Sequence, residues 1–188
     1  MEEEVYEPRE DSFLLEEVIH TSLKAGSIGR ALDMGCGSGI LSIALSGKTS
    51  TVLAVDINPE AVRSAKALAG KEGATNIEFR ESDLFSNVRL DEKFDLIVWN
   101  MPYIPGLEDE ETDLAISCGT PPTRLLEFFE KAASHLTHGG KILYLVSSIT
   151  PLSVNDVEAR GYGVRIVSSL KVPFETLTVF EARLASGV

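Results

Sequence analysis

A glycine-rich turn between two apolar segments constrains this chain more than any other feature. Residues 31–34 form a short, largely apolar run that is too short for a helix and suits a buried parallel strand. Gly35, Gly37 and Gly39 follow, and residues 40–45 then carry apolar side chains at helical spacing. A strand, a glycine turn and a helix in this order let the backbone approach a ligand and point amide N–H groups at it. The sequence therefore predicts an α/β domain with a ligand at this turn.

The glycine spacing separates two ligand classes. Dinucleotides are bound by Gly-x-Gly-x-x-Gly, but here the third glycine comes one residue early and Ile40 stands in its place. Asp33, two residues before the first glycine, would repel a pyrophosphate and can accept a bond from an ammonium group. The pattern Asp-x-Gly-x-Gly-x-Gly resembles motif I of the class I S-adenosylmethionine-dependent methyltransferases, whose ligand is a sulfonium cation with an amino-acid tail. A tight turn without a ligand is the alternative interpretation.

Length and charge limit the organisation and the partners. We expect residues 1–188 to form one domain, because this length supports a substantial core. Cys36 and Cys118 have no metal-ligand spacing, so we expect no metal site. There is no apolar run of membrane-spanning length, and the acidic start is unlike a signal peptide, so we expect a cytoplasmic protein. The net charge of −12, with scattered Lys and Arg, disfavours direct binding of long nucleic acids and favours a neutral or basic protein partner.

Strands and helices are predicted to alternate along most of the chain. Residues 1–10 are expected to be extended and residues 104–120 irregular. The expected strands are 30–34, 51–56, 76–81, 94–99, 141–147, 163–171 and 176–183. The first expected helix begins at an N-cap of Asp11 or Ser12 and ends near Leu23. The other expected helices are 39–47, one that begins at 59 and ends between 70 and 73, 121–137 and 152–160. The last two strands have a short connection and must pair antiparallel. This pattern predicts an α/β sandwich with helices on both faces of one sheet.

Polar residues stand at the ends of four expected strands, at Asp33, Asp56, Asp83 and Asn100. Ligands of open α/β sheets bind beyond the carboxyl ends of the strands, so we expect these residues to line one crevice. An acid at the tip of the second strand, Asp56, is placed to accept bonds from ribose hydroxyls. The alternative for Asp56 is a helix N-cap or loop acid, and the alternative for Asp83 is a turn acid.

The segment Asn100-Met101-Pro102-Tyr103 indicates the reaction type. The lone pair of a planar amide or aromatic amine nitrogen is delocalised, so this nitrogen is a poor nucleophile. Two acceptors at its N–H groups, the side-chain oxygen of Asn100 and the carbonyl of Met101, would localise the lone pair and aim it at a methyl group. Pro102 stiffens the turn and Tyr103 can stack on a planar substrate. A turn without a chemical role is the alternative.

Two motifs together resemble one methyltransferase family. Asn100–Tyr103 is similar to the Asn-Pro-Pro-Tyr of enzymes that methylate planar nitrogens. Residues 5–15 resemble the Tyr-Glu-Pro-Ala-Glu-Asp-Ser/Thr-Phe-Leu-Leu opening of the short eukaryotic and archaeal HemK-like release-factor glutamine N5-methyltransferases, and residues 56–59, 144–146 and 175–177 also match. The resemblance implies a class I, Rossmann-like three-layer sandwich whose seven-stranded, mostly parallel sheet has an antiparallel last strand. It implies S-adenosylmethionine as cofactor and the glutamine of a release factor's Gly-Gly-Gln loop as substrate.

The resemblance also implies roles for individual residues. The residues implied to touch the cofactor are Ser12, Asp33, Gly35, Gly37, Asp56, Ile57, Asp83, Leu84 and Asn100. Among them, Asp83 is expected to accept the adenine amino group and Leu84 to pack on the ring. The implied catalytic segment is Asn100, Met101, Pro102 and Tyr103. Met101 departs from the family by replacing the first proline, and residues 116–122 replace a Trp-Ala-Gly-Gly-type loop, which leaves the substrate contacts open.

The resemblance implies a partner as well, a small zinc-binding activator subunit. We expect it to dock on residues 76–81, because this strand lies at a sheet edge in the class I order. The alternative is an edge protected by its own charges, Glu78, Arg80 and Glu81. The alternatives for function are a nucleic acid amine methyltransferase, a protein lysine methyltransferase, and a non-catalytic subunit that binds the nucleotide only for stability.

Overall fold

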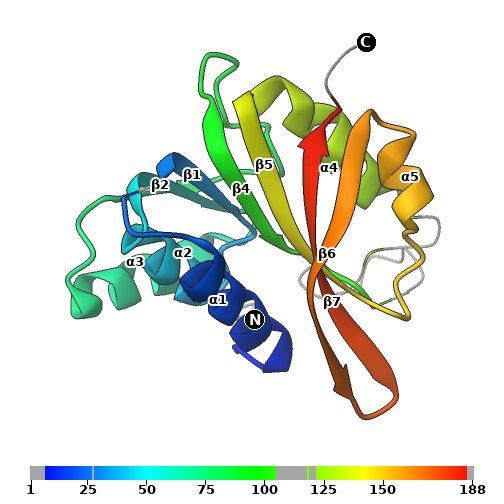
Figure 1. The fold of residues 1–188 in the computed structure, drawn as a ribbon. Helices are drawn as coiled ribbons and strands as arrows, with labels where there is room; N and C mark the ends of the chain where they lie inside the picture. Colours follow the sequence, from blue (N-terminus) through cyan, green and yellow to red (C-terminus); the bar gives the residue numbers. More distant parts are fainter. Residues whose placement is uncertain (1–6, 27, 105–117, 119–121, 186–188) are drawn as a thin grey trace.

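The apolar runs form the middle of a seven-stranded sheet in the computed structural model, which describes residues 7–26, 28–104, 118 and 122–185 (Figure 1). The strands are β1 Ile28–Met34, β2 Thr49–Asp56, β3 Ile77–Glu81, β4 Phe94–Asn100, β5 Leu136–Ser147, β6 Tyr162–Val172 and β7 Glu175–Leu184. Their order is β3-β2-β1-β4-β5-β7-β6. Neighbours from β3 to β5 pair parallel, whereas β7 pairs antiparallel with β5 and β6. The mostly parallel sheet with an antiparallel last strand is therefore confirmed, as is β3 at an edge.

Helices cover both faces of the sheet, as the sandwich prediction requires (Figure 1). They are α1 Glu10–Ser22, α2 Ile40–Ser46, α3 Pro59–Glu72, α4 Thr123–Ala132 and α5 Val154–Glu158. Alternate residues of β4 supply both core layers. Leu96 and Val98 pack in a cluster with side chains of α1 and α2, while Ile97 and Trp99 pack in a cluster with side chains of α4. This double burial is what a central parallel strand requires.

The predicted N-cap of the first helix is wrong. Arg9 takes the N-cap position, and Asp11 and Ser12 lie buried inside the first turn of α1. Glu10 and Asp11 place negative charge where the helix dipole favours it. Because α1 begins earlier than expected, Asp11 lies in its first turn, and its side chain contacts Asn100 at the end of β4.

The boundary between α4 and β5 also differs from the expectation of a helix to residue 137. The helix ends at Ala132, a 3₁₀ turn spans Ala133–His135, and β5 begins at Leu136. The pairing of β4 with β5 shifts between Phe94 and Leu96, so β5 carries a bulge. Gly140 makes this possible, since a Cβ there would lie 2.9 Å from the Phe94 carbonyl oxygen. The smaller boundary changes extend β1 by two residues at its start and shorten α5.

Two predicted segments fall mainly outside the described residues. They are the N-terminal part of the extended stretch, 1–6, and the irregular stretch 104–120, of which 105–117, 119 and 120 are not described. Within that stretch Cys118 is buried, and its backbone N–H donates to the Ile104 carbonyl at 3.0 Å.

Gly37 and Gly39 adopt positive φ angles of 50° and 91° for different reasons. A Cβ on Gly39 would lie 2.8 Å from Cα and Cβ of Ala65 in α3, whereas a Cβ on Gly37 would meet no atom within 4 Å. Gly39 therefore lets α2 pack on α3, and Gly37 faces open space.

We expect Gly39→Ala to lower the free energy of unfolding by roughly 2–4 kcal/mol, because it adds a backbone clash to an unfavourable φ. The matched control Gly37→Ala carries only the φ cost, about 1–2 kcal/mol. Urea denaturation of both variants measures the difference. Equal losses would contradict the assignment of Gly39 to helix packing.

Candidate functional site

Asp33 lies near the carboxyl end of β1 and is fully buried. Its Oδ2 accepts a hydrogen bond from the Ser42 hydroxyl of α2, but its Oδ1 has no hydrogen-bond partner in the described part of the chain. Burial, together with the nearby Asp56 charge and against the Ser42 hydrogen bond, raises the pKa of Asp33 to about 7. A buried acceptor of this kind is costly unless a ligand donor meets it.

Asp56 ends β2 and holds the glycine turn in place. Its Oδ2 accepts from the Gly37 backbone N–H at 2.9 Å, and its Oδ1 accepts from the Asn58 N–H at 2.9 Å. Burial raises the pKa of Asp56, although these backbone donors oppose the rise. Gly35 and Gly37 have φ angles of 65° and 50°, in a region that residues other than glycine rarely adopt. The glycine turn thus adjoins two acidic side chains, the buried Asp33 and Asp56.

The side chains after β3 make contacts within the protein. Asp83 is largely exposed and forms an ion pair with Arg124 of α4. Leu84 has φ 47° and is only 4% exposed, because it packs in the core cluster with Phe85. The adenine contacts of these two residues stay predictions, and the burial of Leu84 does not favour its stacking role. Ile57, directly after Asp56, is 37% exposed.

Asn100 ends β4 and is bound to the start of α1. Its Nδ2 donates to Asp11 Oδ2 at 3.0 Å and to the Ser12 hydroxyl at 3.4 Å. Its Oδ1 is buried and has no hydrogen-bond partner among the residues that the structure describes. A carboxylate oxygen only accepts, so Asp11 fixes which end of the amide faces α1. The Asn100 oxygen is the end that stays available.

The rest of the segment after β4 is well packed. Met101 is 1% exposed in the core cluster on the α4 side, and Pro102 is buried. The methionine side chain thus fills core space at the position where the resembled family has proline. Tyr103 is half-buried against the core on the α1 side, and its carbonyl accepts from the Thr150 hydroxyl at 3.2 Å.

The predicted residues thus form two groups at the carboxyl ends of β1, β2 and β4. Asp33, Asp56 and the glycine turn make one, and Ser12 with Asn100 makes the other. Asp83 stands apart in its ion pair. Sequence reasoning missed the contacts of Asp11, Ser42 and Arg124 with these residues. Only Asp11 had a sequence signal, the acidic residue inside the matched opening motif.

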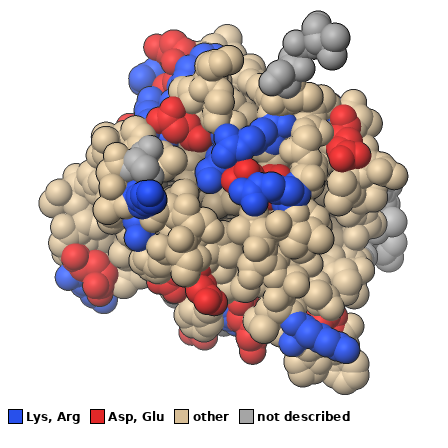
Figure 2. Space-filling view, in the orientation of Figure 1, with Lys and Arg blue, Asp and Glu red and all other residues tan. Residues whose placement is uncertain are grey.

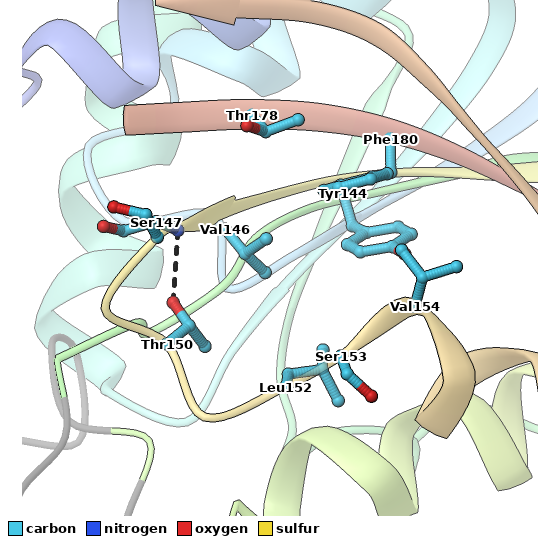
Figure 3. A pocket seen from close by; sticks show the side chains of 10 residues that line it. Tyr144, Val146, Ser147, Thr150, Leu152, Ser153, Val154, Thr178 and Phe180 are labelled. Atoms are coloured by element: carbon cyan, nitrogen blue, oxygen red, sulfur yellow. Dashed lines mark hydrogen bonds between the residues drawn. The ribbon is translucent and has the colours of Figure 1, made fainter. Parts of the chain in front are cut away.

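A hollow of about 190 Å³ lies on the α5 side of the sheet, between β5, β7 and the segment before α5 (Figure 3). Tyr144, Val146, Leu152 and Phe180 supply its apolar wall. Asn100 turns its amide to α1, which packs on the opposite face. The hollow is therefore separate from the two groups of site residues.

Charged side chains in Figure 2 occur in small groups of both signs and form no basic expanse on this face. One group lies on β5, β6 and β7, where Lys141, Arg165 and Arg183 contact Glu181. Burial opposes ionisation of Glu181, but these three cations prevail and lower its pKa to about 2. The described residues contain no group of His, Cys, Asp and Glu suited to a metal ion. No helix among them is long and apolar enough to cross a membrane.

Comparison with known proteins identifies the family. The model of the methyltransferase small domain matches residues 12–156. A protein of Methanocaldococcus jannaschii, MJ0928, is 41% identical over 95% of this chain and 91% of its own length. The chain belongs to the methyltransferase small domain family. MJ0928 is named as a candidate protein N5-glutamine methyltransferase, so this methyltransferase has a relative of that kind along nearly its whole length.

A second relative agrees with this assignment, and a solved structure shares the fold. The release factor glutamine methyltransferase of Leptospira interrogans is 32% identical over 85% of this methyltransferase, which spans 61% of that relative's length. The solved Mtq2–Trm112 complex of E. cuniculi is described as responsible for methylation of the termination factor eRF1. One of its chains superposes on this protein with a TM-score of 0.72 and 23% identity, and the match covers 97% of this protein and 99% of that chain. The shared architecture confirms the predicted class I methyltransferase fold.

The buried carboxyl group of Asp33 predicts a pH-dependent stability. The folded protein holds the Asp33 proton up to about pH 7, whereas the unfolded chain releases it near 3.8. Ionisation therefore costs the folded state stability as the pH rises between these values. Asp33→Asn removes that cost, so we expect the Tm difference between this variant and the unsubstituted protein to grow from about pH 4 to about pH 7 and then to level off. A Tm difference that stays constant over this range would contradict the raised pKa.

Proposed function

We propose that this methyltransferase transfers a methyl group from S-adenosylmethionine to the side-chain amide of glutamine in the Gly-Gly-Gln loop of a class-one peptide chain release factor. One observation carries the proposal. Asn100 offers a buried side-chain oxygen without a partner in the described residues, and Asp11 holds the nitrogen of the same amide. A site that offers acceptors and has its own donor occupied suits a substrate that brings N–H groups.

The proposed chemistry rests on orientation rather than on a strong base. The Asn100 oxygen accepts one N–H of the substrate amide and the Met101 carbonyl accepts the other. The two bonds localise the nitrogen lone pair and hold it in line with the methyl group. S-adenosylmethionine, when bound, supplies an electrophilic methyl group on a sulfonium centre. The buried Met101 side chain and Pro102 fix the direction of the carbonyl.

The residues around the glycine turn fit this cofactor. The buried Oδ1 of Asp33 lacks a donor among the described residues, and the cofactor's ammonium group would supply one and favour the ionised carboxylate. Gly35 and Gly37 let the backbone approach the amino-acid tail. Each Asp56 oxygen accepts one backbone N–H and keeps a lone pair for a ribose hydroxyl. We assign Ser12 and Ile57 to the same cofactor site, with Asp83 and Leu84 at its adenine end.

Relatives and charge favour a protein substrate. The curated relatives compared above carry names of glutamine methyltransferases. The net charge of −12 opposes close approach of nucleic acid phosphates. The amide-directed acceptors distinguish glutamine from lysine, whose amine nitrogen needs no localisation of a delocalised lone pair.

We test the function by methyl transfer from labelled cofactor to a recombinant archaeal release factor, to tRNA and to DNA, with and without the candidate activator. Label should appear on the Gly-Gly-Gln glutamine only.

Asn100→Ala should lower kcat by roughly 10²–10³-fold, because it removes an oriented acceptor, and should leave cofactor affinity nearly unchanged. Asp56→Ala should instead weaken cofactor binding by roughly 1.5–3 kcal/mol, measured by titration calorimetry. Transfer to nucleic acid, or activity of Asn100→Ala within a few-fold of the original, would refute the proposal.

We also propose that a small zinc-binding activator subunit docks on β3, as the E. cuniculi enzyme occurs in a complex with Trm112. The edge position of β3 leaves one side of its backbone unpaired within the sheet. Ile77 and Phe79 are half-buried against the α3 side, while Arg80 on the other face pairs with Glu78 and Glu92. These ion pairs hold the charged face in place and leave the strand's backbone as the docking surface.

Hydrogen exchange with and without the activator checks this docking. Within residues 76–81 we expect the amides of Ile77, Phe79 and Glu81 to gain strong protection on mixing, because these amides face away from β2 and would enter new strand pairing. The opposite edge strand, β6, provides the internal control and should not change. Protection confined to β6, or to no strand, would contradict docking on β3.

A further inference from the structure

Phe174 occupies an unusual position in the turn between β6 and β7. Its side chain is fully exposed, and its φ angle is 71°. Val172 pairs with Glu175, so Pro173 and Phe174 alone make the turn. Pro173 has a fixed negative φ, and a positive φ then follows at the next residue, as in a type II turn.

No contact among the described residues accounts for an aromatic side chain at this position. A type II turn places glycine or asparagine at its second central position, since other residues are strained at positive φ. The exposed ring buries no apolar area that would offset this strain. Strained positions of this kind concentrate where a protein contacts other molecules, and exposed aromatic rings are strong anchors at protein interfaces.

The turn is fastened to the site. Ser147, at the end of β5, donates its hydroxyl to Glu175, the residue after Phe174. The Ser147 backbone N–H donates to the Thr150 hydroxyl at 3.1 Å (Figure 3). The same Thr150 hydroxyl donates to the Tyr103 carbonyl at 3.2 Å. A continuous set of hydrogen bonds thus links the hairpin turn to the Asn100–Tyr103 segment.

Exposed apolar side chains gather at the same end of the sheet. The structure describes ten large exposed apolar side chains, and five of them adjoin the carboxyl ends of the parallel strands or the hairpin turn: Phe13, Ile57, Ile104, Ile149 and Phe174. Leu90 and Leu184 lie at the opposite end. Figure 1 shows the β6–β7 hairpin projecting past the other strands on the side of α1. Phe174 therefore lies on the turn of a hairpin that extends beyond the neighbouring strands.

We propose that Phe174 is a docking anchor for the protein substrate, contacting an apolar patch of the release factor beside the loop that enters the site. This inference rests on the proposed function, because that function makes the substrate a folded protein larger than the loop itself. The apolar ring suits an apolar protein surface better than a phosphate backbone, and the charged residues beside the turn, Lys171 and Glu175, have opposite signs. The contact adds affinity for the whole substrate and takes no part in the transfer step.

Phe174→Gly tests the anchor. With a recombinant archaeal release factor as substrate, we expect KM to rise by roughly 5–30-fold with kcat unchanged, as for loss of an interface hot spot that contributes uniform binding. With a short Gly-Gly-Gln peptide, kcat/KM should stay the same. The Tm should not fall, and can rise by up to roughly 4 °C, because glycine relieves the positive φ. Phe174→Tyr keeps the ring and should keep the original KM.

Leu90→Ser is the matched control, since Leu90 is 80% exposed at the far end of the sheet, and it should leave KM unchanged. An unaltered KM for the release factor in Phe174→Gly would overturn the anchor and leave the proposed function standing. An equal loss of kcat/KM with the peptide and with the release factor would also overturn it. So would a dimer of the unsubstituted protein that dissociates in Phe174→Gly while the KM stays the same. Absence of transfer by the unsubstituted protein to the release factor would overturn both the proposed function and the anchor.

Discussion

The hydrogen bond between Asp11 and Asn100 is the contact on which the proposed chemistry depends. It joins the first turn of α1 to the end of β4, residues that are 89 positions apart. The two ends of an amide are nearly identical in shape but opposite in hydrogen bonding. A carboxylate beside it accepts only, so the nitrogen must face Asp11 and the oxygen must face away. The start of the chain thereby decides whether the site presents an acceptor or a donor to its substrate.

Buried acids in this fold divide into satisfied and unsatisfied ones. Glu92 accepts from Arg80 and Arg30, and the Arg80 hydrogen bonds, opposed by burial, lower its pKa to about 2. Glu181 is held by three cations. Asp33 has no cation of this kind in the part of the chain that the structure describes, and burial raises its pKa instead. The two satisfied acids lie among charged partners of the sheet, while the unsatisfied one stands beside the glycine turn. This contrast is what a site prepared for a cationic ligand requires, and it costs stability.

The sequence predicted most of the fold because its strongest patterns are local. Short apolar runs and glycine turns located the strands, the short final connection required antiparallel pairing, and β3 lies at the edge as expected. The failures came from contacts between distant residues. Asp11 looked like a helix cap because sequence spacing shows nothing of β4, and the bulge of β5 depends on Gly140 lying against the Phe94 carbonyl. The pairing of Asp83 with Arg124 likewise depends on how α4 packs. At the site, residue types at strand ends were predictable, but their partners were not.

The most direct measurement is a crystal structure of this methyltransferase with S-adenosylhomocysteine and a Gly-Gly-Gln peptide bound together. The account predicts that the peptide amide nitrogen lies within hydrogen-bond distance of both Asn100 Oδ1 and the Met101 carbonyl oxygen, while Asn100 Nδ2 keeps its bond to Asp11. A peptide amide bound elsewhere, or one that directs its oxygen toward Asn100, would contradict the account.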